Sequence, residues 1–234
     1  MRAMILAAGR GERMRPLTDT VPKPLLEVGG KALIVRHLEN LVRAGFTRIV
    51  INHAHLGAMI EERVGDGSAL GLSIDYSREG QALDTAGGIA LALPLLGDAP
   101  FLVVNGDIYC EFDFGTLLRR WALMKTSGAI AHLVLVANPL HRPDGDFALV
   151  DERVRNDGSA RLTFSGIGLY NPELFLGLTP GEKVPLAPLL RRAADAGAVT
   201  GEHYRGRWED VGTPQRLAEL DRELSLRKEA CARG

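Results

Sequence analysis

Apolar and polar positions follow two different patterns along the chain, and segments with a strand pattern alternate with segments with a helix pattern. Short continuous apolar runs predict buried strands at 3–8, 46–52, 72–77, 101–107 and 129–136. Apolar residues at helical spacing lie between these runs and predict helices at 32–44, 55–65 and 85–96. Strands that alternate with helices are typical of a mainly parallel or mixed sheet covered on both faces. The pattern therefore predicts a three-layer α/β fold.

The pattern changes after residue 140. Residues 147–171 are expected to form antiparallel strands, because short apolar stretches flank the turn sequence Asn-Asp-Gly-Ser at 156–159. The leucines of the last helix fall on one face, so that helix is expected to pack on the body. Length alone favours one domain over 1–234. Two more helices are predicted at 186–196 and 215–228, with a strand between them at 203–211.

Composition limits the partners that the protein can have. Lys and Arg number 28 and Asp and Glu 29, so a general affinity for nucleic acid or an anionic membrane is not expected. No apolar run approaches the roughly 20 residues of a membrane helix. The two cysteines, Cys110 and Cys231, lack metal-binding spacing and are expected as a near-core thiol and a tail thiol in a reducing compartment. A cytoplasmic protein is expected, as a monomer or a homodimer.

The loop after the first strand has the composition of an anion-binding site. Residues 7–25, AAGRGERMRPLTDTVPKPL, hold two glycines, three arginines and a lysine between prolines. Glycine lets the backbone approach a phosphate, and free N–H groups and guanidinium forks bind its oxygens. A tight turn with solvated arginines is the alternative, and a bare Gly-x-Gly would favour it. Rossmann and Walker A fingerprints are absent, whereas Arg13 and Lys23 together would neutralise a polyphosphate.

Several stretches of the chain resemble one enzyme family. LAAGRGERMRPLT followed by PKPL closely resembles the signature of the sugar-1-phosphate nucleotidylyltransferases, LAAGxGxRxxPxTxxxPKP. The resemblance implies the nucleotide-diphospho-sugar transferase fold, with a nucleotide-binding half over 1–110 and a sugar-binding half over 111–234. It also implies transfer of a nucleotidyl group from an NTP to a sugar 1-phosphate, with release of pyrophosphate. Similar stretches match the family's base-reading loop and its two metal segments, LDTAGGI at 83–89, VNGDI at 104–108 and WEDVGTP at 208–214.

The resemblance also implies a role for each matching residue. Asp107 ends a buried strand, where ligands bind in open α/β sheets, and with Asp210 it would hold one Mg²⁺ on the transferred phosphate. A turn residue and a capped strand end are the alternatives for these two carboxylates. Arg13, Lys23 and Asp107 form the expected catalytic set. Nucleotide contacts are expected from Ala8, Gly9, Gly11, Arg13, Lys23, Gln81, Thr85, Gly87 and Asn105.

The sugar side has fewer matching residues, namely Gly166, Asn171 and Trp208. Asn171 has the alternative of leading into Pro172, and Trp208 that of packing in the core. Many relatives carry a Glu-Lys-Pro segment whose lysine contacts the sugar phosphate, and this chain lacks it. The arginines near the expected place are equally well explained as surface charges, so the sequence does not identify the residue that replaces this lysine.

The overall run most resembles family members that use UTP and N-acetylmuramate 1-phosphate in cell-wall sugar recycling. The class also allows GTP with mannose 1-phosphate, dTTP or UTP with glucose 1-phosphate, and CTP with phosphocholine. A phosphomonoester is largely dianionic at neutral pH, so the attack requires no general base. A non-catalytic nucleotide-sugar sensor is the rival, and it would be expected to lose at least one of Arg13, Lys23, Asp107 and Asp210. All four are present.

Overall fold

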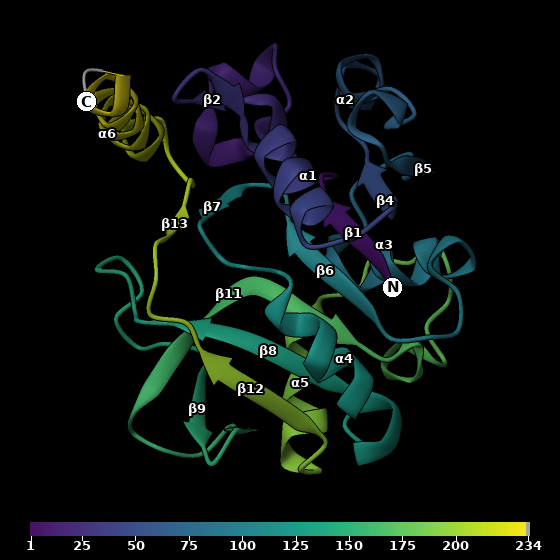
Figure 1. Ribbon diagram of the computed structural model, residues 1–234. Coiled ribbons are helices and arrows are strands. Elements are labelled where there is room, and N and C mark those ends of the chain that lie inside the picture. The colour runs from purple at the N-terminus through teal and green to yellow at the C-terminus, as the bar shows by residue number, and fades with distance from the viewer. Residues whose placement is uncertain (233–234) are drawn as a thin grey trace.

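A nine-stranded mixed sheet forms the centre of the molecule (Figure 1). The computed structural model describes residues 1–232, with the backbone alone at 125, 231 and 232. The strand order is β5-β4-β1-β6-β11-β8-β12-β10-β9, and the first four strands are parallel. This arrangement confirms the predicted α/β class. The parallel strands are β1 (Arg2–Leu6), β4 (Arg48–His53), β5 (Ser73–Arg78) and β6 (Phe101–Asn105).

The second half of the sheet is mixed, as the change of pattern after residue 140 predicts. Strand β11 runs antiparallel to both β6 and β8 and so joins the two halves of the sheet. Strands β9 and β10 pair antiparallel through a tight turn, whereas β12 runs parallel to β8. The strands of this half are β8 (Ala131–Val136), β9 (Phe147–Val150), β10 (Arg153–Arg155), β11 (Arg161–Tyr170) and β12 (Val199–His203).

The single strand predicted over 203–211 is wrong, because the chain forms two strands there. β12 ends at His203, and β13 (Trp208–Asp210) leaves the sheet to pair antiparallel with β7 (Ile108–Cys110). The ring of Tyr204 packs against Gly206 in the connection between the two strands, since a side chain at Gly206 would collide with it. This departure from the sheet carries Asp210 toward the end of β6.

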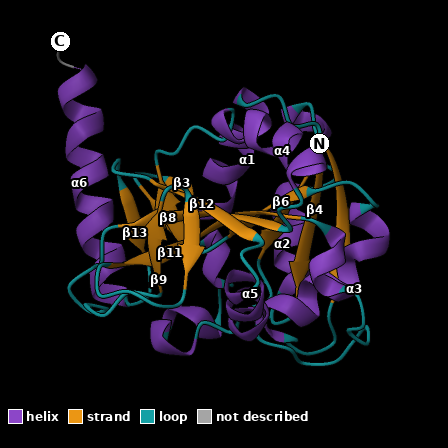
Figure 2. Cartoon of the chain, turned by 90° about the horizontal axis from the view of Figure 1, so that it is seen from below, coloured by secondary structure: helices purple, strands orange, loops and turns teal. Residues whose placement is uncertain are grey.

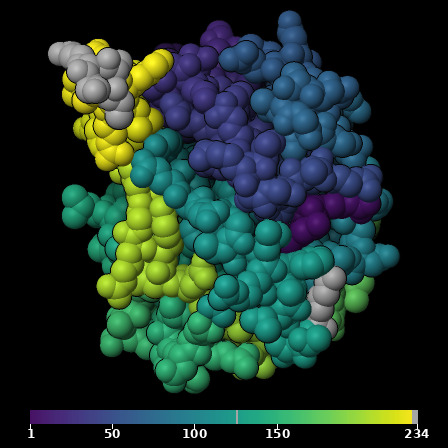
Figure 3. Space-filling view, in the orientation of Figure 1, coloured from purple at the N-terminus to yellow at the C-terminus, as the bar shows by residue number. Residues whose placement is uncertain are grey.

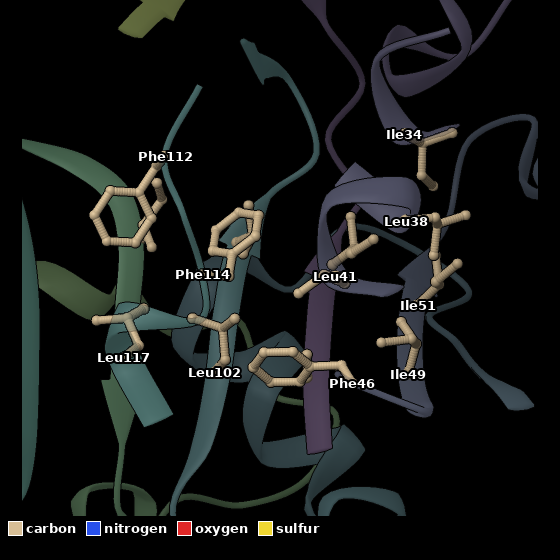
Figure 4. Packing of buried hydrophobic residues seen from close by; sticks show 14 of the residues in the cluster. Ile34, Leu38, Leu41, Phe46, Ile49, Ile51, Leu102, Phe112, Phe114 and Leu117 are labelled. Carbon is tan, nitrogen blue, oxygen red and sulfur yellow. The ribbon is translucent and has the colours of Figure 1, made fainter. Parts of the chain in front are cut away.

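Helices cover both faces of the sheet (Figures 1 and 2). Alternate residues of β1 belong to different cores, with Ile5 in the core beneath α1 and Met4 in the core beneath α3. In Figure 4, apolar residues of α1 point toward Ile49 and Ile51 of β4. The helices of the first face are α1 (Leu33–Arg43), α2 (Gly57–Val64) and α4 (Thr116–Ser127), and those of the other are α3 (Asp84–Leu96) and α5 (Leu186–Asp195).

Helix α4 has no counterpart among the sequence-based predictions. Its apolar residues Leu117, Trp121 and Met124 do recur at helical spacing and pack on the core. Two further leucines, Leu118 and Leu123, lie about half exposed on the other side and blur the pattern. The structure also has five short 3-10 turns, at Glu12–Met14, Leu17–Asp19, Lys23–Leu25, Ser68–Leu70 and Pro172–Phe175.

The C-terminal helix α6 (Pro214–Ala232) lies beside the N-terminal third of the chain (Figure 3). Its buried Leu220 packs on a small hairpin formed by β2 (Glu27–Val28) and β3 (Lys31–Ala32), as the leucine pattern predicts. None of the helices in residues 1–232 is both long and apolar enough to cross a membrane. Cys110 is buried, as expected, whereas the side chain of Cys231 lies outside the described residues.

Candidate active site

A cavity of about 740 Å³ opens where the carboxyl ends of β1, β4 and β6 meet. Ligands of open α/β sheets bind at this edge, and the volume suits a small-molecule site. Leu6, Asn52 and Asn105, the residues at or near these strand ends, all line it. The cavity is also lined by the predicted nucleotide-binding residues of the first loop, namely Ala8, Gly9, Gly11, Arg13 and Lys23.

The arginines of the first loop differ in what they contact. Gly11 adopts φ +70°, and Thr18 donates from its hydroxyl to the Gly11 carbonyl at 2.9 Å. Arg10 donates to the Thr18 carbonyl at 2.6 Å and pairs with Asp19 at 2.8 Å, so it clamps the loop on itself. Arg13 instead lines the cavity. Arg10 thus fits the structural alternative, whereas anion binding stays a prediction for Arg13.

Lys23 and Asp107 form the most buried ion pair at the cavity wall. The Lys23 side chain is 8% exposed, and its Nζ donates to Oδ2 of Asp107 at 2.5 Å. Pro22 and Pro24 flank the lysine and set its direction. A negative and a positive group are thus held together at the point where β6 ends.

The turn that carries Asp107 is fixed from both sides. The Gly106 N–H donates to the Leu6 carbonyl at 2.9 Å, and a Cβ at Gly106 would lie 2.7 Å from the same oxygen. Burial lowers the pKa of His37 to about 4, so its ring is neutral at pH 7. Its Nε2 then donates to the Ile108 carbonyl at 2.9 Å. The backbone on each side of Asp107 is therefore held in place.

The β7–β13 pair brings the two predicted metal ligands together. Asp210 lies opposite Ile108 in this ladder, and so next to Asp107. Its Oδ2 accepts a hydrogen bond from Arg216 at 3.0 Å and lies 3.3 Å from Nε2 of His141. A Cβ at Gly212 would lie 3.2 Å from both Asp210 oxygens, and it would lie 3.3 Å from the guanidinium of Arg13. Asp210 and Arg13 therefore flank one glycine of the cavity wall.

The donor set fits Mg²⁺ rather than a metal held by protein alone. Across the side chains that the structure describes, no three His, Cys, Asp or Glu residues form a metal-holding group. Mg²⁺ in phosphate-transfer sites takes one or two carboxylates and fills its shell with phosphate oxygens and water. Asp107 lines the cavity, and Asp210, which is not itself a lining residue, has its carboxylate beside Gly212 of the cavity wall, so these two are the candidate pair.

The base loop is placed differently from the sequence-based expectation. Thr85 lines the cavity, but Gln81 is exposed and does not belong to the cavity wall as described. Gly87 packs on the segment before α5, since its N–H donates to the Val184 carbonyl and a Cβ there would lie 2.2 Å from the Glu182 carbonyl. Leu83, Asp84 and Thr85 of the predicted base loop line this side, together with three residues that the sequence reasoning missed, Asn52, Glu79 and Ala82.

The three predicted sugar residues have three different surroundings. Gly166 lies at a bulge of β11 with φ +82°, and a Cβ there would lie 2.6 Å from Nδ2 of the cavity residue Asn105. Trp208 packs against the core and donates to the Ser165 carbonyl at 2.9 Å, so it supports the same bulge. Asn171 accepts from the Glu173 N–H at 3.1 Å and caps a 3-10 turn, which is its structural alternative.

The far end of the cavity has charged residues that the sequence did not reveal. Asp146 accepts from Arg142 at 2.7 Å and from the Phe164 N–H at 2.9 Å. The guanidinium of Arg191 lies 5.3 Å from the centre of the Phe147 ring. These five residues all line the cavity. No local motif marks them, because β9, β11 and α5 bring them together only in the folded chain.

Comparisons with known proteins show which family the chain resembles. The family model described as nucleotidyl transferase matches residues 2–145. The chain is 57% identical to the N-acetylmuramate alpha-1-phosphate uridylyltransferase of Neisseria meningitidis serogroup B, over 94% of this chain and 96% of that protein. It is 35% identical to the protein of the same name from Caulobacter vibrioides, over 96% of each. A provisionally assigned glucose-1-phosphate thymidylyltransferase from Bacillus anthracis shares the fold, with a TM-score of 0.84 and 22% identity over 96% of this chain and 95% of that one.

Proposed function

The chain belongs to the nucleotidyl transferase family as a sugar-1-phosphate nucleotidyltransferase, and from this premise we propose that it joins UTP to N-acetylmuramate 1-phosphate. The products are the UDP-sugar and pyrophosphate, and the pathway is the recycling of cell-wall sugar. The observation that carries the proposal is the 57% identity over nearly the whole of both chains to a relative of that name. Asp107 and the cationic loop at one cavity, with Asp210 beside its wall, support it.

The reaction needs positions and charges more than a proton acceptor. An oxygen of the dianionic sugar phosphate forms a bond to the α-phosphorus of UTP. The bond from that phosphorus to the bridging oxygen breaks, and the electron pair leaves with pyrophosphate. Catalysis then rests on alignment of two polyanions and on positive groups where charge develops.

Different residues of the cavity are assigned to different parts of the substrates. We assign Arg13 to the leaving pyrophosphate and Lys23 to the α-phosphate. The glycine loop and Thr85 lie on the nucleotide side, within the half formed by 1–110. Asn105 lies beside Gly166, where that half meets the sugar half, 111–234.

Members of the family generally use a divalent metal ion. Asp107 and Asp210 would hold Mg²⁺ here, and the ion would supply positive charge that polarises the phosphates. The two carboxylates are held in place for this role by the β7–β13 ladder and the His37 hydrogen bond.

A pyrophosphate-release screen with Mg²⁺ tests the proposal. It crosses UTP, dTTP, GTP, CTP and ATP with the 1-phosphates of N-acetylmuramate, N-acetylglucosamine, glucose and mannose. The strongest signal is expected for UTP with N-acetylmuramate 1-phosphate. A stronger signal for another pair would overturn the substrate assignment, and nucleotide binding without any release would favour a sensor.

A further inference from the structure

A buried Asn–Glu pair connects the two loops of the nucleotide side. Asn52, at the end of β4, accepts from the Ala7 N–H at 3.0 Å through Oδ1 and donates from Nδ2 to Oε1 of Glu79 at 2.6 Å. Oε2 of Glu79 accepts from the Leu83 N–H at 2.9 Å. Both side chains belong to residues that are only 2% exposed. Three hydrogen bonds thus run from the start of the first loop to the start of α3.

The polarity of this chain of bonds fixes the orientation of the asparagine. The Ala7 N–H can only donate, and an ionised Glu79 can only accept. Asn52 therefore has one orientation that satisfies both. Burial raises the pKa of Glu79, and the hydrogen bonds from Asn52 and Leu83 oppose that rise. A side chain at Gly88 would press on the pair, since its Cβ would lie 2.4 Å from Oε1 of Glu79.

We propose that Asn52 and Glu79 are positioning residues that set the distance between the phosphate-binding loop and the base loop. Ala7 leads directly into the glycine loop, and Leu83 comes two residues before Thr85. Asn52 and Glu79 line the cavity between these loops. The proposal rests on the proposed function only in requiring that the cavity binds UTP, whichever sugar follows.

The test exchanges the chemistry of the two side chains. Asn52→Asp alone places two carboxylates against each other. Glu79→Gln alone leaves two amide oxygens for three contacts, so one N–H group faces another in any orientation of the two amides. The double variant restores all three bonds. Its new carboxylate at position 52 would accept from the Ala7 N–H and from the new amide at position 79, whose oxygen accepts from the Leu83 N–H. It also keeps the net charge of the original pair. Each single change is expected to raise the Kd and KM for UTP about tenfold, and the double variant to return them near the original values.

The readouts separate positioning from folding. Calorimetry with UTP alone gives the nucleotide affinity without reference to the sugar, and kinetics should show a larger change in KM for UTP than in kcat. Thermal unfolding checks each variant, and if Asn52→Asp does not fold, the comparison of Glu79→Gln with the double variant still decides. A folded Glu79→Gln that keeps its UTP affinity, or a double variant that is not rescued, would overturn the proposal. Loss of the sugar preference alone would leave it standing.

Two arginines that line the cavity, Arg142 and Arg191, bear on how the sugar substrate is bound. Arg142 directly follows His141, whose Nε2 lies 3.3 Å from Oδ2 of Asp210, and Arg142 itself lines the cavity. The guanidinium of Arg191, a residue of α5, lies over the ring of Phe147, and both residues line the same cavity. The pair Arg142–Asp146 uses one nitrogen of the guanidinium, Nη2, and leaves the other donors of this arginine for a ligand.

If the proposed function holds, the substrate has two anionic groups besides UTP. N-acetylmuramate 1-phosphate carries a phosphate and a lactyl carboxylate, and N-acetylglucosamine 1-phosphate differs from it by lacking the lactyl group. Arginine forks match both anions. We infer that Arg142 binds the sugar phosphate, in place of the missing Glu-Lys-Pro lysine, and that Arg191 binds the lactyl carboxylate.

Two variants and two sugars test this division. Arg191→Ala is expected to lower kcat/KM for N-acetylmuramate 1-phosphate about thirtyfold and to leave that for N-acetylglucosamine 1-phosphate within about twofold. Arg142→Ala is expected to lower both by the same factor, about tenfold or more. Where turnover of the second sugar is too slow, its inhibition constant gives the same comparison. Arg192→Ala, an exposed neighbour on α5, is the control and should change neither.

The outcomes separate this inference from the proposed function. An original enzyme that does not prefer N-acetylmuramate 1-phosphate would overturn both. A preference that survives Arg191→Ala, or an Arg191→Ala variant that loses both sugars equally, would overturn only the assignment of Arg191. An Arg142→Ala variant that still turns over both sugars normally would remove Arg142 from the phosphate.

Discussion

Asp107→Asn is expected to lower turnover about a hundred- to ten-thousandfold while the fold survives. Asparagine keeps the size of the side chain and can still accept from Lys23, but it carries no charge for a metal ion. The carboxylate is 36% exposed, so the substitution leaves no buried cavity. Pyrophosphate release at saturating UTP and sugar phosphate, repeated over a Mg²⁺ titration, measures the effect.

The matched control for this experiment is Asp98→Asn. Asp98 is an exposed residue between α3 and β6, outside the cavity wall as described, and its substitution should leave turnover unchanged. Thermal unfolding should show both variants folded. Near-normal turnover of a folded Asp107→Asn variant would exclude this carboxylate from the metal site.

The parallel half of the fold could be predicted because its signal is local. Each buried strand is a short apolar run, and each helix shows its own period. The signal is weaker where exposed leucines blur a helical face, as in α4, and where a chain leaves the sheet, as between β12 and β13. A tertiary contact decides the second segment, since Asp210 of β13 pairs with Ile108 of β7.

Some residues of the candidate site could likewise be predicted from the sequence, and others could not. The first loop and Asp107 follow from composition and from the place of a carboxylate at a strand end. The hairpin-like pairing of β7 with β13 explains why Asp210 lies beside Asp107, although about a hundred residues separate them. Asn52, Glu79 and Arg191 have no motif, because each acquires its surroundings from a different strand or helix. The residues expected to set specificity are thus those that sequence patterns describe least.

Lys23→Met is expected to change two measurable quantities in opposite directions. Turnover should fall about a hundredfold, because the α-phosphate loses a positive partner. The affinity of the free protein for Mg²⁺ should rise about two- to tenfold, because the ammonium no longer competes for Oδ2 of Asp107, 2.5 Å away.

Calorimetry with Mg²⁺ in the absence of UTP, beside the pyrophosphate assay, measures both quantities. Lys31→Met is the control, since Lys31 pairs with Glu39 on α1 and should alter neither. Methionine is close to lysine in length and suits the buried stem, so the comparison isolates the charge. If Lys23→Met binds Mg²⁺ no better than the original protein, Lys23 and the metal do not share Asp107. An increase would mean that Lys23 and the metal compete for the same carboxylate in the free protein.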